Sequence, residues 1–79
     1  MASAVEADGA ELKLTAGDTL LYYGVNEQRM YERGQNRKYL TYAPVEIKDF
    51  SLTQQGSLVQ VAWDTWLGDH AVSGVAYVP

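Results

Sequence analysis

The chain has 79 residues and a net charge of −4, a size that accommodates one small domain with a modest core. It contains no cysteine, which excludes disulfides and thiolate metal sites. No apolar run approaches the roughly 20 residues needed to cross a bilayer, and the acidic start lacks the features of a secretory signal. We therefore expect a soluble protein, either cytoplasmic or part of a virion.

The first part of the chain predicts a tail followed by two strands. Residues 1 to 10 are small and polar and are expected to form a flexible tail, which leaves residues 11 to 79 as one folded domain. Leu12 and Leu14 alternate with charged neighbours, a weak strand pattern. After a turn, the apolar and aromatic residues from 19 to 25 predict a second strand.

Residues 26 to 34 are the one stretch that favours a helix. Asn26 can cap its start, and Gly34 can end it. Such a helix would have about two turns, too short to persist without tertiary contacts. A long ordered loop is therefore the alternative for this early connection.

The second part of the chain predicts further short strands. Residues 37 to 43 alternate in an extended pattern that Pro44 interrupts, which places this piece at an edge or a bend. Turns are expected at residues 54 to 57 and 67 to 70, with strands over 58 to 67 and 71 to 78. In the last strand, Gly74 indicates a close backbone approach or a kink.

The apolar face changes sides between residues 45 and 54. Val45 and Ile47 are odd-numbered, whereas Phe50 and Leu52 are even-numbered. A regular strand cannot do this while it keeps one face buried. We therefore predict a β-bulge near positions 48 and 49.

The two tryptophans occupy opposite faces of one predicted strand. With a period of two, Val59, Val61 and Trp63 share a face, and Trp66 lies on the other. If Trp63 fills the core, Trp66 is left for solvent or a partner, and tryptophan is enriched at binding hot spots. The alternative is a bulge or a covering segment that buries Trp66.

Tyrosines supply further candidate contacts. Tyr22 and Tyr23 are adjacent, so one is expected in the core and the other on the surface. Together with Tyr42 and Trp66 they could form an aromatic cage for a methylated ammonium group. Core packing with one surface ring is the interpretation that the pattern favours.

Positive charge is concentrated in one segment of an acidic chain. Residues 29 to 38 hold four basic residues and one acid, a local charge of +3, whereas the remaining residues sum to −7. The basic residues are Arg29, Arg33, Arg37 and Lys38. Three or four phosphate contacts would give a salt slope of only about −3, so nucleic-acid binding is disfavoured. An acidic patch on a protein is the expected partner, and a solvated loop is the alternative.

Catalytic and metal-binding patterns are weak. His70 is the only histidine, and no cysteine accompanies it. Glu46 and Asp49 could pair as carboxylates, but an odd spacing on a strand points them apart. No phosphate-binding glycine loop is present. We predict neither enzymatic activity nor a cofactor, a metal or a small-molecule substrate.

The layout resembles the SH3-like small barrels, including the Tudor-type modules. The resemblance depends on residues 17 to 24 (GDTLLYYG) as the opening strand and residues 59 to 64 (VQVAWD) as the third, and it spans about residues 12 to 79. Five or six short strands with tight turns and one long early loop themselves suggest a closed or nearly closed small antiparallel barrel, which agrees with this resemblance, and an OB-type barrel is the alternative. Because the early loop is basic rather than acidic, proline-peptide binding is not expected, and no family binding residue is transferred.

The sequence therefore predicts a non-enzymatic module that binds a protein partner or itself through an aromatic patch and a basic loop. The candidate contact residues are Trp66, Tyr22, Tyr23, Tyr42, Arg29, Arg33, Arg37 and Lys38. One alternative is a structural accessory subunit of a larger assembly, such as a virion decoration or adaptor protein. Another is an acidic inhibitor that imitates nucleic acid, although the carboxylates are dispersed along the chain.

Overall fold

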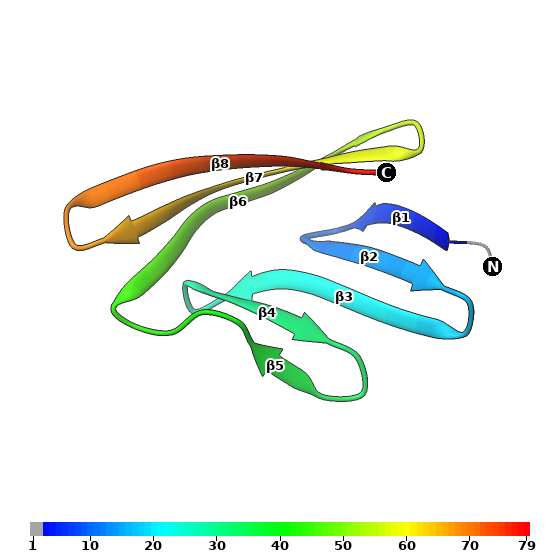
Figure 1. The fold of residues 1–79 in the computed structure, drawn as a ribbon, viewed down its shortest axis with the longest axis horizontal. Coiled ribbons are helices and arrows are strands. Elements are labelled where there is room, and N and C mark those ends of the chain that lie inside the picture. Colours follow the sequence, from blue (N-terminus) through cyan, green and yellow to red (C-terminus); the bar gives the residue numbers. More distant parts are fainter. Residues whose placement is uncertain (1–2) are drawn as a thin grey trace.

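The computed structural model describes residues 3–79 and shows an all-β protein with two antiparallel sheets (Figure 1). The five-stranded sheet contains β1 (Ser3–Asp8), β2 (Glu11–Ala16), β3 (Thr19–Asn26), β4 (Arg29–Arg33) and β5 (Arg37–Tyr39). The three-stranded sheet contains β6 (Val45–Gln55), β7 (Leu58–Leu67) and β8 (His70–Val78). In both sheets each strand pairs with its neighbours in the chain, which confirms the antiparallel all-β class predicted from the sequence.

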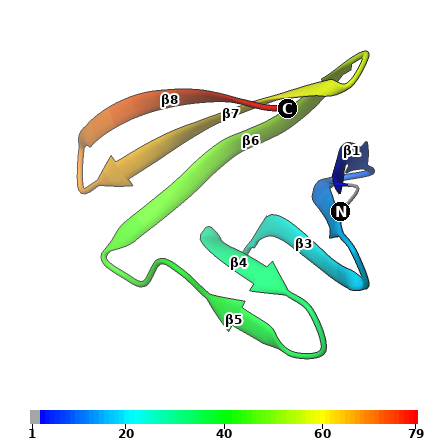
Figure 2. The ribbon, with the colours of Figure 1, turned by 45° about the vertical axis from the view of Figure 1, so that its right-hand side comes forward.

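The two sheets pack face to face over only part of their length (Figures 1 and 2). The β7–β8 hairpin extends past the five-stranded sheet, and Leu67 and Val72 near its tip are 53% and 71% exposed. Within residues 3–79 the two sheets do not join into a closed barrel, and there are eight strands instead of five or six. The SH3-like resemblance therefore stays a prediction.

Two-residue turns connect most neighbouring strands. Gly9, Gly17, Gly56 and Gly68 each begin such a turn with φ between 61° and 63°, a backbone conformation that glycine adopts without steric cost. The turns expected at residues 54 to 57 and 67 to 70 are confirmed.

Residues 26 to 34 form a hairpin instead of the predicted short helix or long loop. β3 turns into β4 through Glu27 and Gln28, whose φ angles of 52° and 62° match a type I′ turn. Asn26 pairs with Arg29 across this turn instead of capping a helix. The helix prediction was wrong because cross-strand pairing with β3 and β5 satisfies the backbone of this segment better than two isolated helical turns.

The core lies between the inner faces of the two sheets. Val59 is fully buried, and Val5 and Val61 are each 7% exposed in the same cluster. Val5 belongs to β1, which pairs with β2 along its whole length. The flexible tail predicted for residues 1 to 10 is therefore corrected over β1, because its apolar residue adds to the core. Met1 and Ala2 lie outside the described residues.

The predicted bulge in β6 is present. The register of β6 against β7 shifts between Lys48 and Ser51, and Asp49 has a φ of 55°. As a result Ile47, which is 4% exposed, and Leu52 both contribute to the interior although their numbers differ in parity.

Each sheet contains a glycine covered by an aromatic ring on the neighbouring strand. A Cβ added to Gly24 would lie 2.7 Å from the hydroxyl oxygen of Tyr31, and one added to Gly74 would lie 2.5 Å from Trp63 ring carbons. Both pairs lie directly opposite in the register. The close backbone approach predicted at Gly74 is confirmed, and Trp63 packs against the core as expected.

Candidate functional site

Arginine and tyrosine side chains alternate on the outer face of the five-stranded sheet. Cross-strand partners share a face, so the pairs of β3 with β4 and of β4 with β5 define this set. We call it the arginine–tyrosine face, and it consists of Tyr22, Arg29, Tyr31, Arg33, Arg37 and Tyr39. The inner residues of the same strands face the core.

Each arginine of this face lies over a tyrosine ring. The distances from guanidinium carbon to ring centroid are 3.8 Å for Arg29 and Tyr39, 4.1 Å for Arg33 and Tyr22, and 4.5 Å for Arg37 and Tyr31. Tyr31 and Tyr39 also contact each other edge to face, with centroids 6.3 Å apart. Such stacking orients a guanidinium and leaves its N–H groups available at the edge.

Glu11 on β2 anchors one end of the arginine–tyrosine face. Its carboxylate accepts hydrogen bonds from Arg33 Nη2 at 2.8 Å, Arg33 Nε at 3.1 Å and the Tyr31 hydroxyl at 2.6 Å. The Arg33 hydrogen bonds, followed by the Tyr31 bond, hold the pKa of Glu11 below its ordinary value. The charge of Arg33 is therefore compensated within the chain.

The two other arginines of the face, Arg37 directly opposite Arg33 and Arg29 at the far end of β4, carry less compensated positive charge. Arg37 is exposed and forms no ion pair with the carboxylates of residues 3–79, and Arg29 contacts Glu27 at 3.7 Å. The hydroxyl of Tyr39 accepts a hydrogen bond from Asn26 Nδ2 at 3.0 Å. That bond, and after it the nearby Arg37 guanidinium, lower the pKa of Tyr39. Tyrosine rings thus orient the guanidinium groups of both Arg29 and Arg37.

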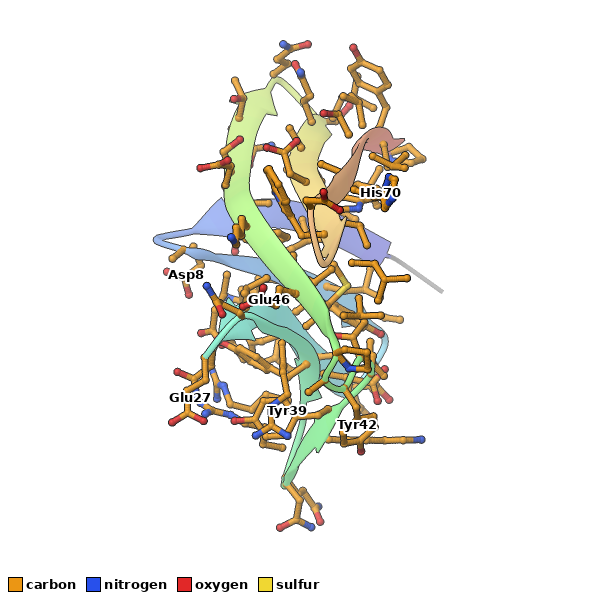
Figure 3. The ribbon with its side chains drawn as sticks, turned by 90° about the vertical axis from the view of Figure 1, so that its left-hand side faces the viewer. Asp8, Glu27, Tyr39, Tyr42, Glu46 and His70 are labelled. Carbon is orange, nitrogen blue, oxygen red and sulfur yellow. The ribbon has the colours of Figure 1, made fainter. Side chains whose placement is uncertain are left out.

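A groove beside Arg29 extends the arginine–tyrosine face toward the start of β6. It has a volume of about 490 Å³, and its lining residues are Glu27, Gln28, Arg29, Tyr42, Ala43, Val45 and Glu46. Tyr42 is 61% exposed, and its ring centroid lies 5.9 Å from the Arg29 guanidinium. Figure 3 shows Glu27, Tyr39 and Tyr42 at the same end of the molecule, with His70 far from them.

The structure brings together five of the predicted contact residues and separates the other three. Tyr22, Arg29, Arg33, Arg37 and Tyr42 lie on the arginine–tyrosine face or directly beside it. Tyr23 instead lies on the inner face, where its hydroxyl donates to Glu32 at 2.7 Å. Lys38 is opposite Glu32 in the register and shares that inner side. The side chains of Tyr22 and Tyr23 therefore point to opposite faces, as their adjacency predicts.

Trp66 lies on the outer face of the three-stranded sheet, away from the arginine–tyrosine face. Its ring is half-buried, and the Lys48 ammonium lies 4.7 Å from the ring centroid. The indole nitrogen is buried and has no hydrogen-bond partner. Tyr22, Tyr42 and Trp66 each contact a different cation, so these rings do not converge into an aromatic cage.

Three residues that form or anchor the arginine–tyrosine face were not among the predicted contact residues: Tyr31, Tyr39 and Glu11. The sequence held a signal for Tyr31, because Arg29, Tyr31 and Arg33 alternate with a period of two. That signal becomes readable only when residues 29 to 33 are assigned to a strand. Glu11 has no comparable signal, since its partner lies 22 residues away.

Two acidic side chains outside this face, Asp49 and Asp64, lie close together. Asp49 at the bulge contacts Asp64, which also accepts a hydrogen bond from Ser73 Oγ at 2.7 Å. The neighbouring Asp64 raises the pKa of Asp49, whereas the Ser73 bond lowers that of Asp64. Glu46, considered from the sequence as the partner of Asp49, lines the groove instead. Within residues 3–79, no three potential metal ligands cluster together.

Comparisons with protein-family models, with curated proteins and with solved structures found no match. In the part of the chain that the structure describes, no helix has the length and apolar character required to cross a membrane.

Proposed function

We propose that this protein is a non-enzymatic binding module whose arginine–tyrosine face binds an acidic segment of a partner protein. The observation that carries the proposal is the stacking of Arg29 and Arg37 on tyrosine rings at 3.8 and 4.5 Å, beside the exposed Tyr42. Tyrosine and arginine are among the residues enriched at protein interfaces. We also propose, from the sequence resemblance, that the fold is related to the SH3-like small barrels.

The distribution of charge supports an acidic polypeptide as the ligand. Glu11 neutralises Arg33, and Glu6 contacts Lys13 at 3.1 Å, so the less compensated cations are Arg29 and Arg37. Each oriented guanidinium group suits a carboxylate, because the two groups can form two parallel hydrogen bonds in one plane. The chain keeps a net charge of −4, which repels any long polyanion, so the proposed ligand is a short acidic segment and not a long nucleic acid.

The test compares two charge-removing variants on the same sheet face. In isothermal titration at low ionic strength, the Arg37→Ala variant should bind a poly-glutamate peptide at least about fivefold more weakly than the unaltered chain does. Lys13→Ala removes the same charge from a cation already paired with Glu6, and its affinity should stay within about twofold.

Two results would contradict this proposal. Equal losses for Arg37→Ala and Lys13→Ala would show a non-specific response to net charge. Tighter and salt-resistant binding of a single-stranded DNA of matched charge would instead indicate a nucleic-acid-binding function.

A structural accessory subunit, in the cytoplasm or in a virion, is the second candidate. The favouring observation is that, among the side chains the structure describes, seven large hydrophobic ones are exposed while five hydrophobic ones are buried. The exposed set is Leu20, Leu40, Tyr42, Leu67, Val72, Val75 and Tyr77. Trp66 adds a half-buried ring on the outer side of the smaller sheet. For this candidate, Trp66→Ala should abolish incorporation into the assembly while the arginine variants assemble normally.

A further inference from the structure

Three of the four edge strands of the two sheets are protected against pairing with another chain. β5 has three residues and carries Arg37 and Lys38. β1 carries Glu6 and Asp8, and its Ala7 N–H donates to the side chain of Gln54 at 2.8 Å. Short length, charge and occupied backbone groups all disfavour edge-to-edge association.

β6 is protected in a different way. The bulge at Asp49 interrupts its edge, and the N–H of Ile47 already donates to the carbonyl of Gln28 at 2.8 Å. A second strand could therefore not pair along the whole of β6.

β8 has none of these protective features. It is nine residues long, its ladder with β7 is regular, and β7 is its only neighbour in the sheet (Figure 1). Residues 71 to 79 contain no charged side chain. Val72, Val75 and Tyr77, three of the exposed large hydrophobic residues, all belong to this strand. A long, uncharged and apolar edge of this kind is a template for strand addition.

The outward-pointing backbone groups of β8 follow from its hairpin. Leu67 and His70 flank a two-residue turn, so they form a hydrogen-bonded pair, and every second residue after His70 also bonds to β7. The intervening residues direct their N–H and C=O groups away from β7. These outward residues are Ala71, Ser73, Val75 and Tyr77.

We infer that β8 pairs with β8 of a second copy of this chain, antiparallel and around a two-fold axis at Gly74. This register overlaps the whole strand and joins outward residues to outward residues: Ser73 lies opposite Val75, and Ala71 opposite Tyr77. The two three-stranded sheets then form one continuous six-stranded sheet. This interface leaves the arginine–tyrosine face free, so the inference does not depend on the proposed function.

Side chains on the inner face fit this arrangement. A cleft of about 220 Å³ opens between the sheets next to β8, and its lining is Leu12, Tyr23, Met30, Phe50, Val61, Trp63, Ala76 and Val78. In the two-fold register, Val72 of the second copy lies opposite Ala76, at the rim of this cleft. Val72 is the most exposed of the large hydrophobic residues, and the pairing covers it.

The charge distribution selects a second copy as the occupant. Each chain has a net charge of −4, so contact through most of its surface brings like charges together. The β8 edge is the exception, because the side chains of residues 71 to 77, which pair in this register, are all uncharged in both copies. Apolar side chains and backbone groups then make the contact without like-charge repulsion.

The size of the interface predicts its strength. Each copy contributes the nine residues of β8, compared with about 20–30 residues a side in a standard interface. The dimer should therefore be weak, with a dissociation constant in the range of roughly 10 μM to 1 mM.

The test combines mass measurement with amide exchange in the unaltered chain. Sedimentation equilibrium from about 10 μM to 1 mM should show a monomer–dimer equilibrium with no larger species. Over the same range, the amides of Ala71, Ser73, Val75 and Tyr77 should become protected, while protection of the even-numbered β8 amides stays constant. A monomer at every concentration, growth beyond the dimer, or protection of the four amides only by a different protein would overturn the inference.

A pair of variants at Val75 isolates the backbone contribution. Val75→Pro removes one outward N–H without removing a bond to β7, and it should raise the dissociation constant at least about tenfold. Val75→Ala keeps the N–H and should raise it by less than about threefold. Unchanged dimerisation of a folded Val75→Pro variant would contradict the arrangement. If that variant does not fold, the exchange pattern of the unaltered chain decides.

Discussion

At the scale of single residues, one carboxylate organises much of the arginine–tyrosine face. Glu11 on β2 reaches across β3 to bind both Arg33 and Tyr31 on β4. The ring of Tyr31 can cross β3 because Gly24 has no side chain there. Removing Glu11 would therefore disturb two side chains and leave the Arg33 charge without its partner.

Glu11→Gln should destabilise the fold by about 1 kcal/mol at pH 7, a figure that allows for the partial exposure of the ion pair. The pKa of Glu11 is lower in the folded chain than its ordinary value of 4.5. The stabilisation is thus fully present above pH 4.5 and is lost as the pH falls through the folded-state pKa. Urea denaturation of both proteins between about pH 2.5 and 7 should show stability curves that converge in acid.

Glu6→Gln is the control for this pH series. Glu6 also contacts a cation on the same face, but its side chain is 57% exposed, compared with 23% for Glu11. Its effect on stability should be much smaller. A pH-independent gap between Glu11→Gln and the unaltered chain would refute the charge-based explanation.

The two tryptophans show which side-chain positions could be predicted from the sequence. The opposite orientations of Trp63 and Trp66 follow from the period of two and were predictable. The position of Lys48 over Trp66 was not, because it depends on the pairing of β6 with β7 across the bulge.

At the scale of elements, the β3–β4 hairpin decides whether the arginine–tyrosine face exists. The capping signals of Asn26 and Gly34 are local and favour a helix, but the alternation from Arg29 to Arg33 suits a strand. Pairing with β3 on one side and β5 on the other outweighs the local preference. Only in this pairing do the arginines and tyrosines share one surface.

Replacing Glu27-Gln28 by Asn-Gly should stabilise the protein by about 1 kcal/mol. Both residues now adopt positive φ angles, which cost L-residues roughly 1–2 kcal/mol each and which Asn-Gly adopts most readily. Thermal unfolding of the variant should show a correspondingly higher midpoint.

Asp18→Gly provides the matched control, because Asp18 occupies the second position of a turn in which only Gly17 has positive φ. That substitution should lower stability, since it adds freedom to the unfolded chain without relieving strain. A loss of stability in the Asn-Gly variant would show that the turn is not type I′.

At the scale of the whole molecule, a small interior must hold two sheets together. Val5 from β1 and Val59 and Val61 from β7 form one cluster across the interface. This cluster explains why β1 belongs to the fold although its sequence is small and polar. The two sheets should therefore unfold together.

Val5→Ala should destabilise the protein by about 1–2.5 kcal/mol and lower amide protection in both sheets. The exposed Val72→Ala variant, measured at a concentration that keeps the chain monomeric, should stay within about 0.5 kcal/mol of the unaltered chain. Loss of protection confined to β1 and β2 would instead indicate two independently stable sheets.

The sequence by itself determined the all-β class, the bulge in β6, most turns and the alternation of faces along β7. These features depend on neighbours within a few residues, so the chain encodes them locally. Only the tertiary structure decided that β1 joins the core, that residues 29 to 33 pair as β4, and that two open sheets form instead of a barrel. Those outcomes depend on which strands meet and which faces they cover, and the free energy of that choice comes from contacts between residues far apart in the chain.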